Sequence, residues 1–155
     1  MNDMTMSHDR QNTLHLISGI RRALPFVLGY LPIGFAYGVL ALKNGLSPAN
    51  TVAMSLIVYA GSAQLIAVAL FAAGLPPLTV IVTTFVVNLR HMLMSASLAP
   101  HLRSWPMSLK LWFGAQLTDE SFALHAMRFA EGDTDRAATL AANMTLQASW
   151  VLGTV

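Results

Sequence analysis

A long stretch of the chain carries no formal charge, and this constrains the fold more than any other feature. Between residues 44 and 89 the sequence contains no Asp, Glu, Lys or Arg, and the next charge is Arg90. A soluble domain carries about 25% charged residues. This chain has 10% charged and 55% hydrophobic residues, with a mean hydropathy of +0.57. A run this long and this apolar predicts an integral membrane protein.

The composition also argues against several classes of function. The formal net charge is only +2 at pH 7, and no basic patch is interleaved with aromatic residues, so nucleic acid is not an expected partner. The sequence has no cysteine, which excludes disulfides and thiolate metal sites. It contains neither an H-E-x-x-H nor a G-x-S-x-G motif. We therefore expect no enzyme, no metal and no cofactor.

The apolar runs predict an all-α, polytopic transmembrane helix bundle with about five spans. A span needs about 20 apolar residues. The candidates are residues 23–42, 49–73, 78–99, 109–130 and 137–155. Residues 1–22 form a polar leader, which we expect to be disordered or to lie on the membrane surface around Leu14, Leu16 and Ile17. Residues 23–155 would then form one transmembrane domain.

Proline and glycine predict breaks and close contacts within these spans. Pro32 falls near the middle of the first span, where it should kink the helix. Gly34 and Gly38 have the G-x-x-x-G spacing that favours close packing against another helix. Gly61 lies in a cluster of small residues that permits close approach or local unwinding. We expect some helices to be interrupted near the membrane midplane.

The third span carries two sets of polar residues. One set recurs at spacings of 4, 3 and 4 and therefore shares one helical face: Thr84, Asn88, His91 and Ser95. Arg90 lies about a quarter turn away from His91, at about 100° per residue. Either this helix has two polar faces, or it is interrupted near Asn88.

Polar residues of different spans are expected to lie at similar depth. Those close to the middle of their segments are Ser62, Gln64, Asn88, Arg90, Asp119 and Glu120. A charged side chain costs about 2.5–3.5 kcal/mol at the centre of a spanning helix. Such a residue therefore needs polar partners and marks a functional hypothesis. Polar groups gathered at the midplane are typical of a transporter site.

The charges suggest that such a site binds a zwitterionic, apolar solute such as an aliphatic amino acid. Arg90 could form a bidentate pair with a carboxylate. Asp119 or Glu120 could hold an ammonium group or carry a coupling proton, and His91 is a further candidate for proton coupling. Additional hydrogen bonds to the substrate would come from Ser62, Gln64 and Asn88.

Two of these interpretations have structural alternatives. Arg90 could simply pair with Asp119 or Glu120 and hold the bundle together. His91 could be a buried histidine with satisfied hydrogen bonds. In the last span, Asn143 and Gln147 are expected to form interhelical hydrogen bonds.

The remaining signals concern orientation. Placing the N-terminus in the cytoplasm puts five basic residues inside, namely Arg10, Arg21, Arg22, Arg128 and Arg136. It puts three outside, namely Lys43, Arg103 and Lys110. This is a modest bias in the direction of the positive-inside rule. Trp105, in a loop at 100–110, is expected to be an interfacial anchor.

Four motifs resemble the AzlC family of branched-chain amino acid exporters. They are Pro-Ile-Gly-Phe-Ala-Tyr-Gly (32–38), Tyr-Ala-Gly-Ser-Ala-Gln (59–64), Asn-Leu-Arg-His (88–91) and Thr-Asp-Glu (118–120). They follow the family's order and approximate spacing, and the resemblance runs from about Gly19 to the end. It implies a large, multi-pass permease subunit in the inner membrane, with a small AzlD-type membrane subunit as its partner.

Family members continue for several more spans, so we expect the permease domain to be incomplete at its C-terminal end. The substrate would be a branched-chain amino acid, and we expect its export to be coupled to protons. The alternative is a non-transporting scaffold, or a fragment that functions only when assembled with a partner subunit.

Overall fold

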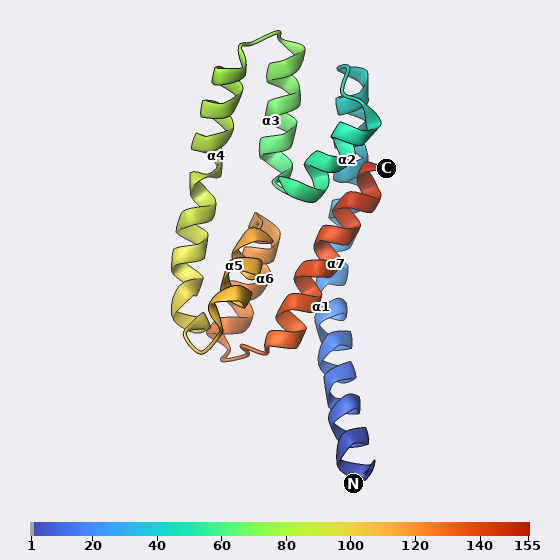
Figure 1. The fold of residues 1–155 in the computed structure, drawn as a ribbon, viewed down its shortest axis with the longest axis vertical. Coiled ribbons are helices and arrows are strands. Elements are labelled where there is room, and N and C mark those ends of the chain that lie inside the picture. The colour runs from blue at the N-terminus through green and yellow to red at the C-terminus, as the bar shows by residue number, and fades with distance from the viewer. Residues whose placement is uncertain (1) are drawn as a thin grey trace.

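The computed structural model describes residues 2–155, with side chains from residue 11 onward, and this part of the chain is all α-helical (Figure 1). The helices are α1 (Asn2–Lys43), α2 (Pro48–Ile57), α3 (Gly61–Ala72), α4 (Pro77–Leu98), η1 (Ala99–Leu102), α5 (Met107–Ala115), α6 (Asp119–Ala130) and α7 (Arg136–Thr154). Within the described chain, two helices are long and apolar enough to cross a membrane, namely Gln11–Lys43 and Pro77–Leu102.

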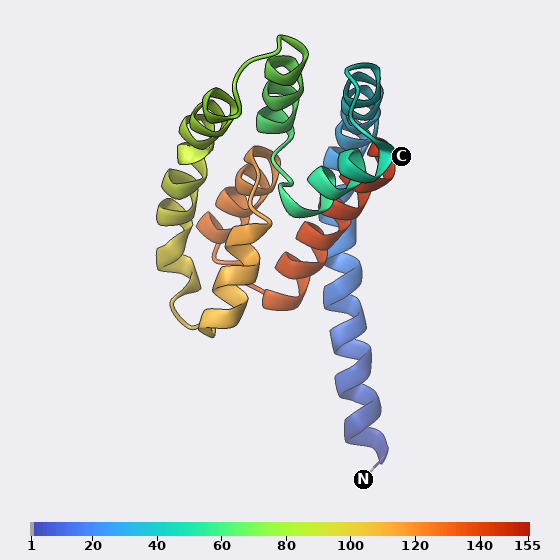
Figure 2. The same cartoon turned by 45° about the horizontal axis from the view of Figure 1, so that its top comes forward.

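The segment expected to form the second span folds back on itself. α2 and α3 form a helical hairpin, so the chain returns toward the end of the molecule where α1 ends (Figures 1 and 2). Phe71, near the end of α3, lines one groove with Leu46 and Asn50 at the start of α2. The expected interruption near Gly61 is present, but the prediction that residues 49–73 form a single span is wrong.

The fourth segment forms a second hairpin, which enters from the opposite end of the molecule (Figure 1). The ring centroid of Phe113 on α5 lies 5.2 Å from that of His125 and 6.2 Å from that of Phe129, both on α6. The two helices are thus antiparallel neighbours. The prediction of one continuous span at residues 109–130 is also wrong.

Helix length explains both hairpins. α2, α3, α5 and α6 contain 10, 12, 9 and 12 residues. At a rise of 1.5 Å per residue they reach only about 14–18 Å, whereas the hydrocarbon core of a bilayer is about 30 Å thick. The breaks fall near the middle of the two expected spans, as predicted. At the first of them, Tyr59 adopts a left-handed backbone conformation with φ of 42°.

Neither α1 nor α4 is interrupted. α1 continues as one helix through Pro25 and Pro32, so Pro32 does not break it. A proline removes only one backbone donor, and α7 packs against α1 on both sides of these prolines, at Gly19 and at Gly38. The polar leader is the first part of α1 rather than a disordered segment. α4 passes Asn88 without a break, which leaves the alternative of two polar faces.

α1 packs most extensively against α7, and glycine makes this contact possible. A Cβ atom at Gly34 would lie 2.8 Å from the carbonyl oxygen of Trp150, and one at Gly38 would overlap the backbone of Thr154. On the other helix, a Cβ atom at Gly153 would lie 2.6 Å from the carbonyl oxygen of Leu31. The packing role of the G-x-x-x-G spacing is confirmed.

α7 also contributes the expected interhelical hydrogen bonds. The side chain of Asn143 is fully buried and accepts a hydrogen bond from His125 Nε2 at 2.7 Å. Gln147 Oε1 accepts from Gln116 Nε2 at 2.7 Å, and Gln147 Nε2 donates to the carbonyl oxygen of Leu56 at 3.1 Å. Through Gln147, α7 is tied to the tips of both hairpins.

A cluster of buried apolar side chains lies where α4, α5 and α6 meet. It contains Met94, Leu98, Leu102, Trp105, Phe113, Leu117 and Phe129. Trp105 is buried, with its ring 5.9 Å from that of Phe113 in an edge-on geometry. The expectation that Trp105 anchors the chain at a membrane interface is therefore wrong, because the folding back of α5 onto α6 encloses it.

The hairpins change the distribution of basic residues. Because α2–α3 returns to its starting end, α4 runs back toward the end where α1 begins (Figure 1). Contacts confirm this: Arg136 Nη2 donates to the carbonyl oxygen of Ser104, and Arg22 pairs with Asp133 at 2.8 Å. Arg103 and Lys110 thus join the N-terminal end of the molecule, contrary to the placement expected from five spans.

Among basic residues with described side chains, six now lie toward the N-terminal end, namely Arg21, Arg22, Arg103, Lys110, Arg128 and Arg136. Lys43 lies at the other end, and Arg90 lies between. The bias is therefore stronger than five spans would give.

The α1–α7 contact predicts opposite effects for one substitution at two glycines. Gly38→Ala should lower the free energy of unfolding by about 1–3 kcal/mol, because the added methyl group overlaps the backbone of Thr154. Gly29→Ala, on the same helix with nothing within 4 Å of its Cβ position, should be neutral or stabilise by up to about 1 kcal/mol. Thermal unfolding of the detergent-solubilised protein measures both. Equal changes in Tm would contradict the packing described.

Candidate functional site

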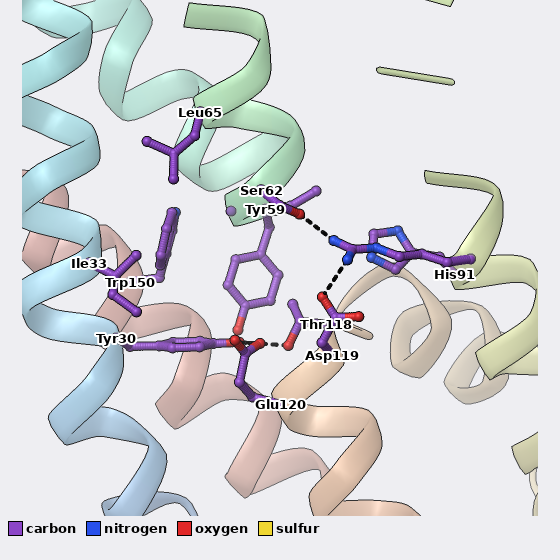
Figure 3. A pocket seen from close by; sticks show the side chains of 13 residues that line it. Tyr30, Ile33, Tyr59, Ser62, Leu65, His91, Thr118, Asp119, Glu120 and Trp150 are labelled. Atoms are coloured by element: carbon purple, nitrogen blue, oxygen red, sulfur yellow. Dashed lines mark hydrogen bonds and ion pairs between the residues drawn. The ribbon is translucent and has the colours of Figure 1, made fainter. Parts of the chain in front are cut away.

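A cavity of about 210 Å³ lies where the tips of the two hairpins meet α1, α4 and α7. It is lined by Tyr30, Ile33, Tyr59, Ala60, Gly61, Ser62, Leu65, Arg90, His91, Thr118, Asp119, Glu120 and Trp150. Figure 3 shows the polar side chains of α4 and α6 on one side, and Ile33, Leu65 and Trp150 on the other. The site thus has a charged end and an apolar end.

Arg90 connects the three elements at the charged end. Its Nη1 atom lies 3.0 Å from Asp119 Oδ2 at the start of α6, and its Nη2 atom donates to Ser62 Oγ at the start of α3. The Nε atom of Arg90 is buried without a hydrogen-bond partner among the described residues. One guanidinium group therefore links α4 to both hairpin tips, while its Nε–H stays without a partner among the described residues.

Glu120 is held separately from Arg90. The Tyr30 hydroxyl donates to Glu120 Oε2 at 2.7 Å, and it shares a second hydrogen bond of 2.6 Å with Thr118 Oγ1. Tyr30 is only 4% exposed. The two adjacent acids of α6 thus have different environments: Asp119 pairs with a cation, whereas Glu120 accepts from a neutral hydroxyl group.

The two helices that begin at the cavity differ in their N-terminal capping. Thr118 and Ser121 form a capping box at the start of α6, in which each side chain accepts from the other's backbone N–H. At the start of α3, Ala60 provides no side-chain cap. The first backbone N–H groups of α3 are therefore without a side-chain acceptor, at a helix end that favours negative charge.

Tyr59 extends from one hairpin tip toward the other. Its backbone belongs to the break between α2 and α3, and Figure 3 shows its hydroxyl group pointing toward Tyr30 and Glu120. The side chain is 4% exposed, and its hydroxyl group has no hydrogen-bond partner among the described residues. Tyr59 thus places a buried hydroxyl group beside Tyr30 and Glu120.

The structure brings together most of the residues expected at this site. Ser62, Arg90, His91, Asp119 and Glu120 all line the cavity. These residues meet because the two hairpins bring the first residues of α3 and of α6 next to the middle of α4.

Two expected residues do not line the cavity. Gln64 is fully buried behind it, where its Oε1 atom accepts from Trp150 Nε1 at 3.1 Å. Asn88 lies outside the cavity, and its buried Oδ1 atom has no hydrogen-bond partner among the described residues.

Seven residues of the cavity wall are not among the site residues expected from the sequence, and four of them carry a hydroxyl group or an indole N–H, namely Tyr30, Tyr59, Thr118 and Trp150. Tyr30 and Trp150 look like ordinary apolar residues of spans, and no spacing signal marks them. Tyr59 and Thr118 are the first residues of two of the four motifs quoted above, at 59–64 and 118–120, and this was the available signal for them.

The geometry suits a small solute with two opposite charges and an apolar part. The volume of about 210 Å³ is below the roughly 300–1,000 Å³ of pockets for drug-sized ligands. The guanidinium group and the uncapped start of α3 favour an anionic group, and the two carboxylates of α6 favour a cationic one.

Comparisons with known proteins place the chain in a family of membrane proteins. The family model described as AzlC protein matches residues 25–155. The inner membrane protein YgaZ of Escherichia coli K12 is 33% identical over 144 residues, which is 90% of this chain and 58% of that protein. An uncharacterized membrane protein of Archaeoglobus fulgidus is 32% identical, over 76% of this chain and 51% of that protein.

The branched-chain amino acid transport protein AzlC of Bacillus subtilis 168 is 28% identical, over 73% of this chain and 44% of that protein. No solved structure matches. The chain spans between 42% and 64% of the length of the curated relatives it matches. The family match covers most of the chain, and we conclude that this is a membrane protein of the AzlC family.

Proposed function

We propose that the protein is a secondary transporter that exports branched-chain amino acids. The observation that carries the proposal is the cavity itself, in which a cation and two carboxylates face an aliphatic and aromatic wall. Membership of the AzlC family and the printed name of the Bacillus relative support the substrate class. Solute sites at the junction of interrupted helices are common in secondary transporters.

The contacts of Arg90 suggest how a zwitterion would bind. The substrate carboxylate would take the free Nε donor of Arg90 and the uncapped N–H groups of α3. The substrate ammonium group would take the place of Arg90 next to Asp119. In the structure Arg90 and Asp119 form an ion pair at 3.0 Å. A bound zwitterion would replace this pair by two, one between its carboxylate and Arg90 and one between its ammonium group and Asp119.

Glu120 is the better placed of the two acids to carry a coupling proton. Asp119 is already compensated by Arg90, whereas Glu120 Oε2 accepts from the hydroxyl group of Tyr30, which also bonds to Thr118 Oγ1. Protonation of Glu120 would therefore not break an ion pair. His91 also lines the cavity and is a second candidate for proton coupling.

The complete transport unit extends beyond the part described. Because the chain spans between 42% and 64% of its relatives' length, a full substrate pathway would involve further helices. We also propose a small AzlD-type membrane subunit as partner and a multi-pass inner-membrane location with a cytoplasmic N-terminus. The clustering of six basic residues toward the N-terminal end supports this orientation.

In the alternative proposal, the same contacts have a purely structural role. In that case the Arg90–Asp119 pair only ties α4 to the second hairpin, and the chain is a scaffold that functions through a partner. The two proposals differ in whether the wild-type protein itself carries out counterflow.

Arg90→Lys should lower counterflow of labelled leucine by about tenfold or more in vesicles, while the protein still accumulates in the membrane. The reason is that lysine keeps the charge and loses the planar fork that binds a carboxylate in bidentate fashion. Arg103→Lys, an exposed residue of the loop before α5, is the matched control and should leave counterflow unchanged. Normal counterflow by Arg90→Lys in the full-length protein would remove Arg90 from the substrate site and leave its pair with Asp119 a structural contact, whereas absence of counterflow by the wild-type protein would support the scaffold alternative.

Glu120→Gln should make leucine export insensitive to an imposed pH gradient, because the amide cannot take up a proton. Asp119→Asn should instead weaken leucine binding while the pH dependence persists. Glu131→Gln, a mostly exposed acid at the end of α6, should change neither. Export rates at several gradients in reconstituted vesicles measure these effects, and an unchanged pH dependence in both Glu120→Gln and Asp119→Asn would exclude proton coupling through these two acids.

A further inference from the structure

The apolar end of the cavity is built around one tryptophan, and its role goes beyond the proposed function on which this inference rests. Trp150 of α7 lies beside Ile33 and Leu65 at the end remote from Arg90 (Figure 3). A zwitterion whose charged groups bind Arg90 and Asp119 would direct its side chain toward these three residues. Their positions therefore decide how large that side chain can be.

Trp150 is fixed on several sides. Its ring is stacked on that of Tyr37, with centroids 6.0 Å apart and planes inclined by 26°, and it meets the ring of Tyr30 edge-on at 5.6 Å. The indole N–H donates to Gln64 Oε1 at 3.1 Å. Because Gln64 and Tyr37 are themselves fully buried, these partners have little freedom to move.

The first hairpin also fits closely against the indole ring. A Cβ atom at Gly61 would lie 2.8 Å from the outer edge of the Trp150 ring. The ring can therefore occupy its place only because the first residue of α3 has no side chain. A rigid wall of this kind cannot retreat to accept a bulkier solute, since packed interiors resist added volume.

We propose that Trp150 determines the size of side chain that the cavity accepts, and that Gln64 acts as a positioning residue by holding the indole ring in place. Aliphatic side chains fit between the ring, Ile33 and Leu65, whereas the ring of an aromatic amino acid would collide with Trp150. Gln64 thus acts on the substrate through Trp150. This role fits the position of Gln64 behind the cavity wall.

The test measures selectivity in vesicles that contain the natural full-length protein. Counterflow of labelled leucine is competed with unlabelled phenylalanine and with unlabelled leucine, and the ratio of the two inhibitory concentrations is compared among variants. Trp150→Leu should raise the relative affinity for phenylalanine by about tenfold, the lower end of the effect of a changed apolar pocket wall. Trp112→Leu, at an exposed position of α5, is the matched control and should leave the ratio unchanged.

Two variants of Gln64 separate positioning from general stability. Gln64→Leu removes the acceptor of the indole N–H and should shift the ratio in the same direction as Trp150→Leu. Gln64→Glu retains an acceptor oxygen at the same place and should keep the wild-type ratio, even where the transport rate falls. A purely structural role of Gln64 would lower the rate in both variants without changing the ratio.

The outcomes distinguish this inference from the proposed function. Absence of leucine counterflow by the wild-type protein would overturn the proposed function, and this inference with it. Wild-type counterflow with an unchanged ratio in Trp150→Leu would overturn the inference alone. Where Trp150→Leu does not accumulate, the comparison of Gln64→Leu with Gln64→Glu decides, and equal ratios in these two variants would overturn the proposal.

Discussion

Broken helices in the middle of a membrane protein need partners for their free backbone groups, and this requirement organises the whole molecule. In hydrocarbon, irregular backbone is tolerated only where protein surrounds it or where it lines a cavity. Here both breaks lie against each other and against α7. Gln147 donates to the carbonyl oxygen of Leu56 near the first break and accepts from Gln116 at the second. The close α1–α7 contact at Gly34 and Gly38 places α7 where it can do this.

The same arrangement explains why charged residues can lie there. Arg90 has partners on the first turns of α3 and α6, and Glu120 has a hydroxyl partner on α1. Without the two hairpins, each of these groups would face lipid at a cost of several kcal/mol. The site therefore depends on the path of the chain as well as on the types of residue that line it.

Much of this could be read from the sequence, because composition and local chemistry carry the information. The all-α class, the position of α4, the break near Gly61 and five of the residues that line the cavity follow from apolar runs and polar interruptions. The hairpins could not be predicted, since an apolar run of span length reads the same whether the helix continues or turns back. Gln64 belongs to the first hairpin, and Trp105 directly precedes the second. Gln64 therefore bonds to Trp150 behind the cavity wall, and Trp105 is buried and not at a membrane interface.

The opposed entry of the two hairpins has a consequence for how a solute would travel. α2–α3 fills the space between the charged cluster and the end of the molecule where α1 ends, and α5–α6 fills the space toward the other end (Figure 1). A molecule leaving the centre therefore meets a different pair of short helices in each direction. The two ends of the cavity are thus covered by separate parts of the chain, each joined to the rest of the fold by its own loops.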